Sequence, residues 1–498
     1  MLIYLSSTIF LCAIGLNSYV SRARFLRKRA SRDHGETVNE NLPELVVQLP
    51  IYNECNSVEQ LIRCFDQVEY PREKLLIQIL DDSDDETTDI IASLLLEQTK
   101  RDSFEHIRRE SRSGFKAGAL DYGMRLHPNL NFIAIFDADF RPDPDFLLKA
   151  VSHLLKNPDL GLVQGRWEHT NEEESLFTRF QSVGMDGHFA IEQPARAWNG
   201  HLMNFNGTAG VWRREAIEQG GGWSCKTLTE DLDLSYRVQL RTDYRLDYLM
   251  ELSCPAEIPD NINAFKSQQY RWAKGSTQTF LHLFKEVLLS DKSVFTKIEA
   301  FFHLTHYFIH PLLLTNFLLG LYFISNPQLL HPYPVEWLYI MLLFACAGPS
   351  LLYRESRLAL NKNSLPLYFY GLMICLGCGM AYNNSRAVLS ALLGRESPFV
   401  RTPKKGEVKR KAYLSLSGNH WIIEILLAGT GFYFLAKAGQ IHSIISPFLL
   451  IYSLGFLVIG TLSALEGSSQ SFSFLNPVRS LEPSQNPIKS GGSKSALR

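Results

Sequence analysis

The sequence predicts an α/β domain with a mostly parallel sheet, joined to an α-helical part that lies in a membrane. From about residue 40 to residue 290, short apolar runs alternate with amphipathic stretches, as expected of strands and covering helices. The remaining chain carries several apolar stretches long enough to cross a bilayer. The formal net charge of −1 over 498 residues argues against nucleic acid as the main partner.

The N-terminal segment predicts a membrane anchor. Residues 1–19 are apolar, and the positive charges follow them, up to residue 32. A secretory signal peptide carries its positive charges before the apolar run. Residues 1–32 are therefore expected to form an uncleaved transmembrane anchor with a basic flank, and the next domain is expected to begin in the cytosol.

The segment 40–290 predicts alternating strands and helices. The expected strands are residues 45–49, 75–80 and 132–136, and the expected helices are residues 57–65, 87–99 and 116–127. This alternation implies right-handed crossovers and a sheet covered on both faces.

Acidic side chains follow two of the expected strands. Asp81 and Asp82 follow one, and Asp137 and Asp139 follow another, so all four are expected at the carboxyl edge where such sheets bind ligands. Two carboxylates one residue apart suit Mg²⁺ or Mn²⁺, which share their coordination sphere with substrate phosphates. Asp-x-Asp also occurs at solvated turns, so the metal site depends on the other motifs.

Two further segments are expected at the same edge. Residues 50–54 leave the first strand there, and Lys116 opens a helix after residues 111–114, where a cation and free backbone amides favour an anion. Lys116 could equally be an ordinary exposed lysine. Residues 206–210 form a turn of small residues that lets the backbone approach a ligand closely.

Two later motifs carry further polar side chains. Thr229 is a plausible helix cap before Glu230 and Asp231, although a capped surface helix would have the same pattern. In Gln-Gln-Tyr-Arg-Trp at 268–272, the arginine can bind a diphosphate bidentately, and the tryptophan offers a flat face to a sugar ring. Arg-Trp is also a common stacked surface pair.

The segment 295–465 predicts a transmembrane domain. Together with the N-terminal anchor, four further apolar stretches give about five spans: residues 301–324, 336–352, 420–435 and 444–465. Residues 366–393 are apolar but lie between two basic segments, which are expected in the cytosol. About 28 residues cannot cross twice, so we expect them along the interface or re-entering the membrane. Residues 466–498 are expected to be a disordered cytosolic tail.

The cysteine and histidine patterns favour structural roles over redox chemistry or metal binding. The eight cysteines show no disulfide framework, which fits a reducing cytosol, and the CxxC at 375–378 lies in an apolar segment that favours packing. His303, His306 and His310 share one helical face, for which packing or pore lining is favoured over metal binding.

The ordered set of motifs resembles the processive family 2 glycosyltransferases, the group of cellulose synthase, hyaluronan synthase and plant mannan synthase. It comprises the acids at 81–82, Asp-Ala-Asp at 137–139, Thr-Glu-Asp at 229–231 and the motif at 268–272. The segments 163–167, 205–212 and 230–233 are similar to the cellulose synthase-like mannan and glucan synthases of the A and C groups and their bacterial relatives. The loop 395–411 contains Phe-Val-Arg-Thr-Pro-Lys, similar to the gating loop of cellulose synthase except that Arg401 replaces a valine.

The resemblance implies a GT-A-type fold and a role for each site residue. For the donor, Asp82 would bind the nucleotide base, Lys116 would lie near the base and diphosphate, and Gln268 and Arg271 would bind the diphosphate. Asp139 would bind the metal, and Asp137 would hold the nucleotide sugar or the metal's water shell. For the transfer, Asp231 would be the catalytic base, Glu230 would contact substrate, and Trp272 would stack under the acceptor sugar.

The implied activity is inverting transfer of a hexose from UDP-glucose or GDP-mannose to a growing β-linked glycan, with Mg²⁺ or Mn²⁺ as cofactor and membrane lipids as surroundings. A single-sugar transferase acting on a lipid acceptor remains an alternative, as does a transporter or scaffold with an inactive transferase domain. The expected location is the inner membrane if the source is bacterial and the Golgi if it is plant-like, with the catalytic domain in the cytosol.

Overall fold

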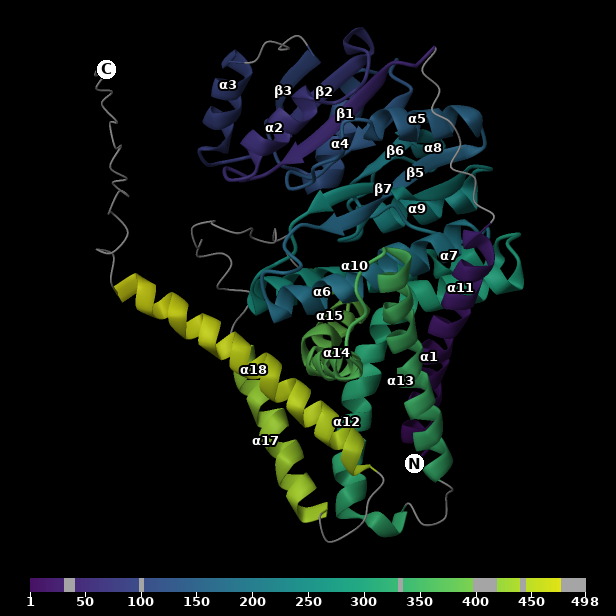
Figure 1. The fold of residues 1–498 in the computed structure, drawn as a ribbon, viewed down its shortest axis with the longest axis vertical. Helices are drawn as coiled ribbons and strands as arrows, with labels where there is room; N and C mark the ends of the chain where they lie inside the picture. The colour runs from purple at the N-terminus through teal and green to yellow at the C-terminus, as the bar shows by residue number, and fades with distance from the viewer. Residues whose placement is uncertain (31–40, 98–102, 330–334, 397–418, 439–444, 476–498) are drawn as a thin grey trace, which may run out of the picture.

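The protein consists of a sheet domain above a bundle of long helices (Figure 1). The structure, a computed structural model, describes residues 1–30, 41–97, 103–329, 335–396, 419–438 and 445–475. The predicted loop at 395–411 and the tail beyond residue 475 lie almost entirely outside these residues.

The first half of the sheet is parallel, as predicted. Its strands are β1 (Leu45–Ile51), β2 (Leu75–Asp81), β3 (Phe104–Arg108) and β4 (Phe132–Ile135), in the order β3-β2-β1-β4. The connecting helices are α2 (Val58–Asp66), α3 (Thr87–Glu97) and α4 (Phe115–Leu126), each within two residues of its predicted bounds. The sequence did not predict β3, because this edge strand has only two apolar residues and half-buried side chains.

The second half of the sheet is mixed. It contains β5 (Leu160–His169), β6 (Gly210–Arg213) and β7 (Arg245–Ala256), and the full order is β3-β2-β1-β4-β6-β5-β7. The short strand β6 runs antiparallel to both β4 and β5, whereas β5 and β7 are parallel. The sheet is therefore mostly parallel, with one reversed strand directly beside β4.

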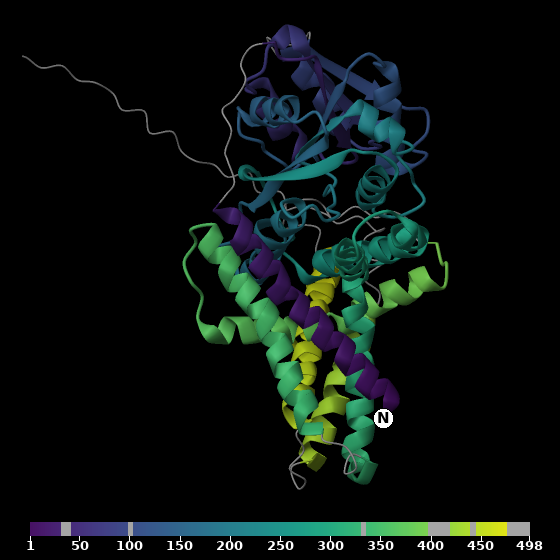
Figure 2. The ribbon, with the colours of Figure 1, turned by 90° about the vertical axis from the view of Figure 1, so that its right-hand side faces the viewer.

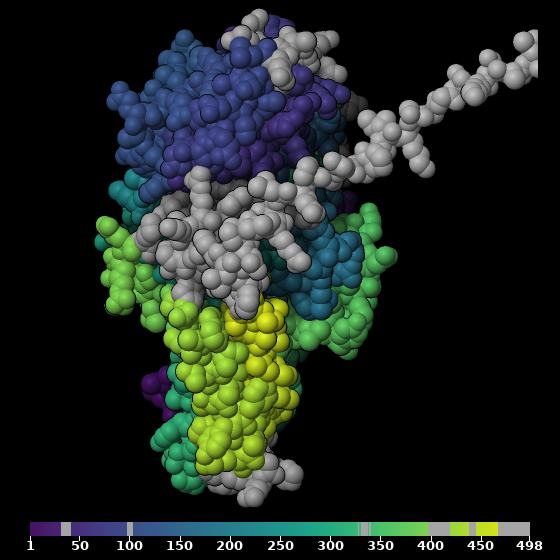
Figure 3. Space-filling model, turned by 90° about the vertical axis from the view of Figure 1, so that its left-hand side faces the viewer, coloured from purple at the N-terminus to yellow at the C-terminus, as the bar shows by residue number. Residues whose placement is uncertain are grey.

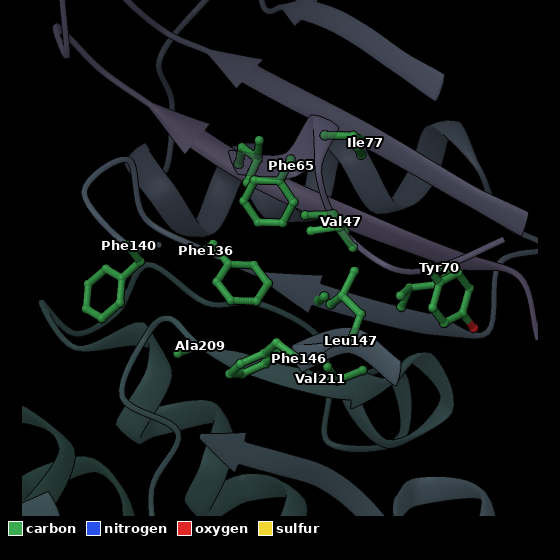
Figure 4. Packing of buried hydrophobic residues seen from close by; sticks show 14 of the residues in the cluster. Val47, Phe65, Tyr70, Ile77, Phe136, Phe140, Phe146, Leu147, Ala209 and Val211 are labelled. Carbon is green, nitrogen blue, oxygen red and sulfur yellow. The ribbon is translucent and has the colours of Figure 1, made fainter. Parts of the chain in front are cut away.

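A buried aromatic cluster fixes the carboxyl end of β4 (Figure 4). The Phe136 ring packs edge-on against Phe65 and Phe146, with centroid distances of 5.1 and 5.2 Å. All three side chains are fully buried. Because Phe136 precedes the Asp-Ala-Asp segment directly, this packing holds the first aspartate at the sheet edge.

Within the described residues, the second half of the domain contains seven further helical segments. They are α5 (Phe146–Lys156), α6 (Leu176–Gly187), a π-helical turn (His188–Glu192), α7 (Gln193–Ala197), α8 (Arg214–Gln219), α9 (Glu230–Arg241) and α10 (Ile262–Leu289). The long helix α10 lies between the sheet domain and the bundle (Figure 1).

The bundle contains the apolar helices of both chain ends. Its helices are α1 (Leu2–Arg29), α11 (Val294–Thr305), α12 (Ile309–Ser325), α13 (Val335–Ala359), α14 (Leu367–Gly379), α15 (Ala381–Leu392), α17 (His420–Ala438) and α18 (Ser446–Leu475). Helices α1 and α13 run side by side (Figures 1 and 2), and α17 and α18 form one face of the bundle (Figure 3). Small residues allow the close approach of α1 and α13: a Cβ atom on Gly15 would lie 2.6 Å from that of Ala345.

Three helical segments within the described residues are long and apolar enough to cross a membrane. They are Leu2–Arg29, Val294–Ser325 and Ser446–Glu466. The predicted spans that overlap α13 and α17 are not among them, so the count of five stays a prediction. The segment 366–393 forms the helix pair α14 and α15, which does not settle whether it lies along the interface.

The first residues of the predicted C-terminal tail, 466–475, belong to a helix. Helix α18 continues to Leu475 instead of ending before residue 466. The Glu466 carboxylate accepts hydrogen bonds from the backbone of Ile262 and Asn263, and these contacts tie α18 to the start of α10 at the point where the prediction placed the end of order.

Candidate active site

All of the predicted site residues line one pocket at the carboxyl edge of the sheet. The pocket is bordered by the ends of β1, β2 and β4, the loop before β6, the start of α9 and the first half of α10. Its lining includes Asp82, Lys116, Asp137, Asp139, Glu230, Asp231, Gln268, Arg271 and Trp272. The sequence therefore identified a set of side chains that the fold brings together from positions almost 200 residues apart.

Asp81 ends β2 at the carboxyl edge, where it was predicted, but it does not line the pocket. Its side chain is buried, accepts hydrogen bonds from Ser83 N and Thr88 Oγ1, and lies 3.0 Å from His106. Burial alone would raise the pKa of Asp81, but the hydrogen bonds from His106, Ser83 and Thr88 outweigh it and lower the pKa to about 2. Consecutive strand residues point to opposite sides, so only Asp82 of the two faces the pocket.

The carboxylate of Asp82 is held by Arg109. The two form a bidentate pair at 2.9 and 2.5 Å, and Arg109 also donates to the carbonyl groups of Ser113 and Phe115. The arginine therefore fixes both the acid and the turn that opens α4. This pair could not be predicted from the sequence, because it depends on the position of β3.

A second arginine in the pocket, Arg112, lies over the ring of Tyr52. The guanidinium carbon of Arg112 is 3.2 Å from the ring centroid of Tyr52, and both side chains line the pocket. Tyr52 belongs to the segment 50–54 that was expected at this edge. A flat cation over a flat ring is a surface on which a planar heterocycle can stack.

Lys116 is fixed by two partners inside the pocket. Its Nζ atom donates to Asp137 at 2.5 Å and to the carbonyl oxygen of Gly207 at 2.9 Å, and its side chain is 17% exposed. Burial acts to lower the pKa of Lys116, but the carboxylates of Asp137, Glu230 and Asp231 outweigh burial and raise it. The lysine is therefore charged and lies among the acids.

Asp137 and Asp139 are suited to a divalent cation that is completed by substrate. Both are partly exposed in the pocket, and the backbone N–H of Asp137 donates to Thr208 Oγ1 at 2.9 Å. Within the described chain no group of three or more His, Cys, Asp or Glu side chains could enclose a metal by itself. Two carboxylates facing an open pocket fit Mg²⁺ or Mn²⁺, which take their remaining oxygen ligands from phosphate and water.

Asp231 stands in the first turn of α9. Its Oδ1 atom accepts a hydrogen bond from the N–H of Leu232 at 2.8 Å. Burial and the adjacent Glu230 raise the pKa of Asp231 to about 7, against smaller lowering effects of Leu232 N–H, Lys116 and Arg271. A carboxylate with this pKa can accept a proton near neutral pH. Thr229, the residue before α9, occupies the predicted cap position, but its hydroxyl makes no capping hydrogen bond.

Gln164 supports the small-residue turn at 206–210. Its buried amide donates to the carbonyl groups of Thr208 and Ala209, and its oxygen accepts from Asn206 N. Ala209 has a φ of 56°, an uncommon backbone conformation for alanine that these bonds stabilise. Because this turn supplies the carbonyl group for Lys116 and the hydroxyl group behind Asp137, Gln164 acts on the site through the backbone.

Helix α10 carries the far wall of the pocket. Gln268, Arg271 and Trp272 share one face of α10, as their spacing requires. Among the residues that the structure describes, the buried Oε1 atom of Gln268 has no hydrogen-bond partner. A buried polar atom without a partner at a pocket wall indicates that a ligand or water completes the site.

The three bundle histidines make separate contacts. His303 is hydrogen-bonded to Tyr236 at 2.8 Å, His306 to the carbonyl group of His303, and His310 to Asn384 at 2.9 Å. These contacts agree with the packing interpretation.

Comparison with known proteins shows which proteins this chain is similar to. The profile described as "Glycosyl transferase family group 2" matches residues 132–352, which contain β4, α9 and α10. A probable glucomannan 4-beta-mannosyltransferase 11 of Arabidopsis thaliana is 37% identical over 283 residues, which are 55% of this chain and 64% of that protein. Glucomannan 4-beta-mannosyltransferase 7 of the same plant is 38% identical, with 54% of this chain and 49% of that protein covered. The chain thus spans about half to two thirds of the length of these relatives.

A solved structure supports the fold. A mannosyltransferase from Pyrobaculum calidifontis, in complex with GDP-Man and Mn²⁺, superimposes with a TM-score of 0.53 at 20% identity, covering 79% of this chain and 99% of the other. The comparisons confirm the resemblance inferred from the motifs. Residues 132–352 thus match the glycosyl transferase family group 2 profile, and the chain is similar over about half of its length to glucomannan 4-beta-mannosyltransferases of plants.

Proposed function

We propose that this protein is a membrane-embedded inverting hexosyltransferase that transfers mannose, or alternatively glucose, from a nucleoside diphosphate sugar to a β-linked glycan. The observation that carries the proposal is the single pocket in which Asp231, with a pKa of about 7, lies with the Asp137–Asp139 pair, Lys116 and Arg271. The names of the plant relatives support mannose as the first sugar to test. So does the GDP-Man bound to the structural neighbour.

The proposed binding mode assigns each side of the pocket to one part of the donor. The base lies between Asp82 and the Tyr52–Arg112 pair, and the diphosphate lies near Lys116, Gln268 and Arg271. Asp139 would hold a divalent cation, with Asp137 as a second ligand or as a partner of its water, and this cation would supply positive charge to the departing diphosphate. Trp272 offers its ring to the acceptor sugar.

The transfer itself needs one base. Asp231 takes the proton from the acceptor hydroxyl as that oxygen attacks the anomeric carbon from the face opposite the diphosphate. The bond between the anomeric carbon and the diphosphate breaks in the same step, so an α-linked donor gives a β-linked product. Lys116 and Arg271 stabilise the charge on the leaving diphosphate, and Glu230 contacts substrate beside the base.

The membrane arrangement belongs to the same proposal. Residues 1–32 form the anchor, residues 295–465 the transmembrane domain with about five spans, and residues 40–290 the cytosolic catalytic domain. The arginines at the end of α1 support this orientation, because basic residues flank spans on the cytosolic side. The enzyme is proposed to extend its glycan repeatedly and pass it through the bundle, with residues 395–411 as a gate, in an inner or Golgi membrane.

Incorporation of labelled sugar tests the proposal. Purified protein in proteoliposomes is offered GDP-mannose and UDP-glucose separately, with Mg²⁺, with Mn²⁺ or with a chelator, and the products are separated into polymer and lipid fractions. We expect metal-dependent label in a polymer that a β-1,4-specific glycanase degrades. Label found only in an organic-soluble monoglycosyl lipid would establish a lipid acceptor instead, and no turnover of either donor would contradict the proposal.

A further inference from the structure

The first turns of α10 are bound by helices from the far C-terminal part of the chain. The Glu466 carboxylate on α18 accepts hydrogen bonds from the N–H groups of Ile262 and Asn263 at 2.8 and 3.1 Å, and from the Asn263 side chain at 3.1 Å. These backbone groups are among the donors that a helix start leaves without partners. A negative charge at this end also complements the helix dipole.

One turn further along α10, a buried ion pair makes the second contact. Lys266 Nζ lies 2.7 and 2.8 Å from the two carboxylate oxygens of Glu424 on α17, and 3.2 Å from the hydroxyl of Ser463 on α18. The Lys266 side chain is 8% exposed and that of Glu424 is 0% exposed. A fully buried carboxylate needs its partner, so this contact fixes the distance between α10 and the helix pair α17–α18.

A third contact comes from α15. The side-chain amide of Asn383 donates to the carbonyl oxygen of Lys266 at 2.9 Å. The turn of α10 that carries Lys266 is therefore held through its backbone as well as through its ammonium group.

This turn stands directly before the pocket residues. Lys266 precedes Gln268 by two positions and Arg271 by five, which at 1.5 Å per residue is about 3 and 8 Å along the helix axis. The helix is continuous between them. Any shift of Lys266 along or around the axis is therefore transmitted to the side chains at the diphosphate end of the pocket.

We infer that Glu424 is a positioning residue for donor binding: together with Ser463 and Glu466 it sets the place of α10, so that Gln268 and Arg271 meet the diphosphate. The inference rests on the proposed function and deepens it. The helix pair α17–α18 then has a part in handling the nucleotide, although no residue of that pair lines the pocket.

The test measures nucleotide binding apart from transfer. Full-length Glu424→Gln, which keeps the shape of the side chain and removes its charge, is titrated with GDP and with UDP in detergent, and its donor KM and kcat are measured. We expect the Kd of the diphosphate that the wild type binds, and the donor KM, to rise by about tenfold, with a smaller change in kcat. The reversed pair Lys266→Glu with Glu424→Lys should recover most of the loss.

The matched control is Glu299→Gln. This carboxylate on α11 is 3% exposed and pairs with Arg24, so its loss costs stability in the same bundle without touching the start of α10. We expect a lower Tm and an unchanged Kd. If Glu424→Gln does not fold, the smaller change Ser463→Ala is measured instead. We expect it to raise the Kd about threefold to fivefold, because a hydrogen bond to Lys266 is lost.

Two negative results have separate meanings. A folded Glu424→Gln protein, or failing that a folded Ser463→Ala protein, whose Kd and donor KM equal those of the wild type would overturn the inference. A wild-type protein that binds the nucleotide but transfers no sugar would overturn the proposed function and leave the binding comparison intact.

Discussion

The ammonium group of Lys116 lies 2.5 Å from the carboxylate of Asp137. The same nitrogen donates to the carbonyl oxygen of Gly207, and a Cβ atom built on Gly207 would lie 3.0 Å from a carboxylate oxygen of Asp231. One lysine thus links the acids at the end of β4 to the proposed base at the start of α9. Its charge lowers the pKa of Asp231, so the pH dependence of the transfer rate reports on this arrangement.

The rate should fall in acid with a midpoint near neutral pH. The folded-state pKa of Asp231 is raised to about 7, so the carboxylate that accepts the proton is mostly absent at pH 5 and mostly present at pH 8. We expect kcat/KM for the donor to rise about tenfold per pH unit below 7 and to level off above it. A flat profile between pH 5 and pH 8 would exclude Asp231, with this pKa, as the base.

Replacement of Lys116 by methionine should move that profile. Lys116 lowers the pKa of Asp231, so its removal should shift the acid limb to higher pH, by about one unit for a neighbouring charge. The donor KM should rise as well, because a cation facing the diphosphate is lost. Lys149→Met, at an exposed pair with Asp145 on α5, is the control that should change neither quantity.

The adjacent acids Asp81 and Asp82 should respond differently to the same substitution. Asp81→Asn should lower the free energy of unfolding by about 2 kcal/mol, because a buried carboxylate with a depressed pKa loses its charged hydrogen bonds. Since the folded pKa is about 2, this stabilisation is present in the wild type above pH 4 and is lost as the pH falls toward 2. Asp82→Asn should instead raise the donor KM. Urea titrations and donor saturation curves on both variants separate the two roles, and equal effects on KM would contradict the assignment.

Gly275→Ala should increase the distance between α10 and α9, the helix that carries Asp231. A Cβ atom on Gly275 would lie 2.5 Å from Cγ2 and 2.7 Å from Oγ1 of Thr229, the residue before the Glu230–Asp231 pair. We expect a loss of about 1 to 3 kcal/mol in stability. A fall in kcat should accompany it, and both losses should be partly restored by a second change, Thr229→Ala. Gly184→Ala on α6, where the new methyl would meet only Met373 at 3.7 Å, should be tolerated.

The parallel half of the sheet and the pocket residues were predictable because their signals are local. A short apolar run followed by acids predicts a strand end, and the order of such ends places them at one edge. Strands β3, β5, β6 and β7 were not predicted; β3 has few apolar residues and β6 has only four residues. The exclusion of Asp81 from the pocket follows from strand pleating and could have been predicted.

Ion pairs between residues far apart in the chain could not be predicted from the sequence. Arg109 reaches Asp82 across 27 positions, and Lys266 reaches Glu424 across 158. Neither pair has a spacing that marks it, and both depend on the packing of elements that meet only in the folded chain.

The substitution Asp231→Asn tests the proposed catalytic base, measured in two assays on the same preparation. We expect transfer from the donor to fall by at least about a thousandfold, as for loss of a general base. The Kd for the nucleoside diphosphate should stay within about threefold of the wild-type value, because the base contacts the acceptor hydroxyl. An Asp231→Asn protein that transfers sugar at a rate near that of the wild type would contradict the proposal.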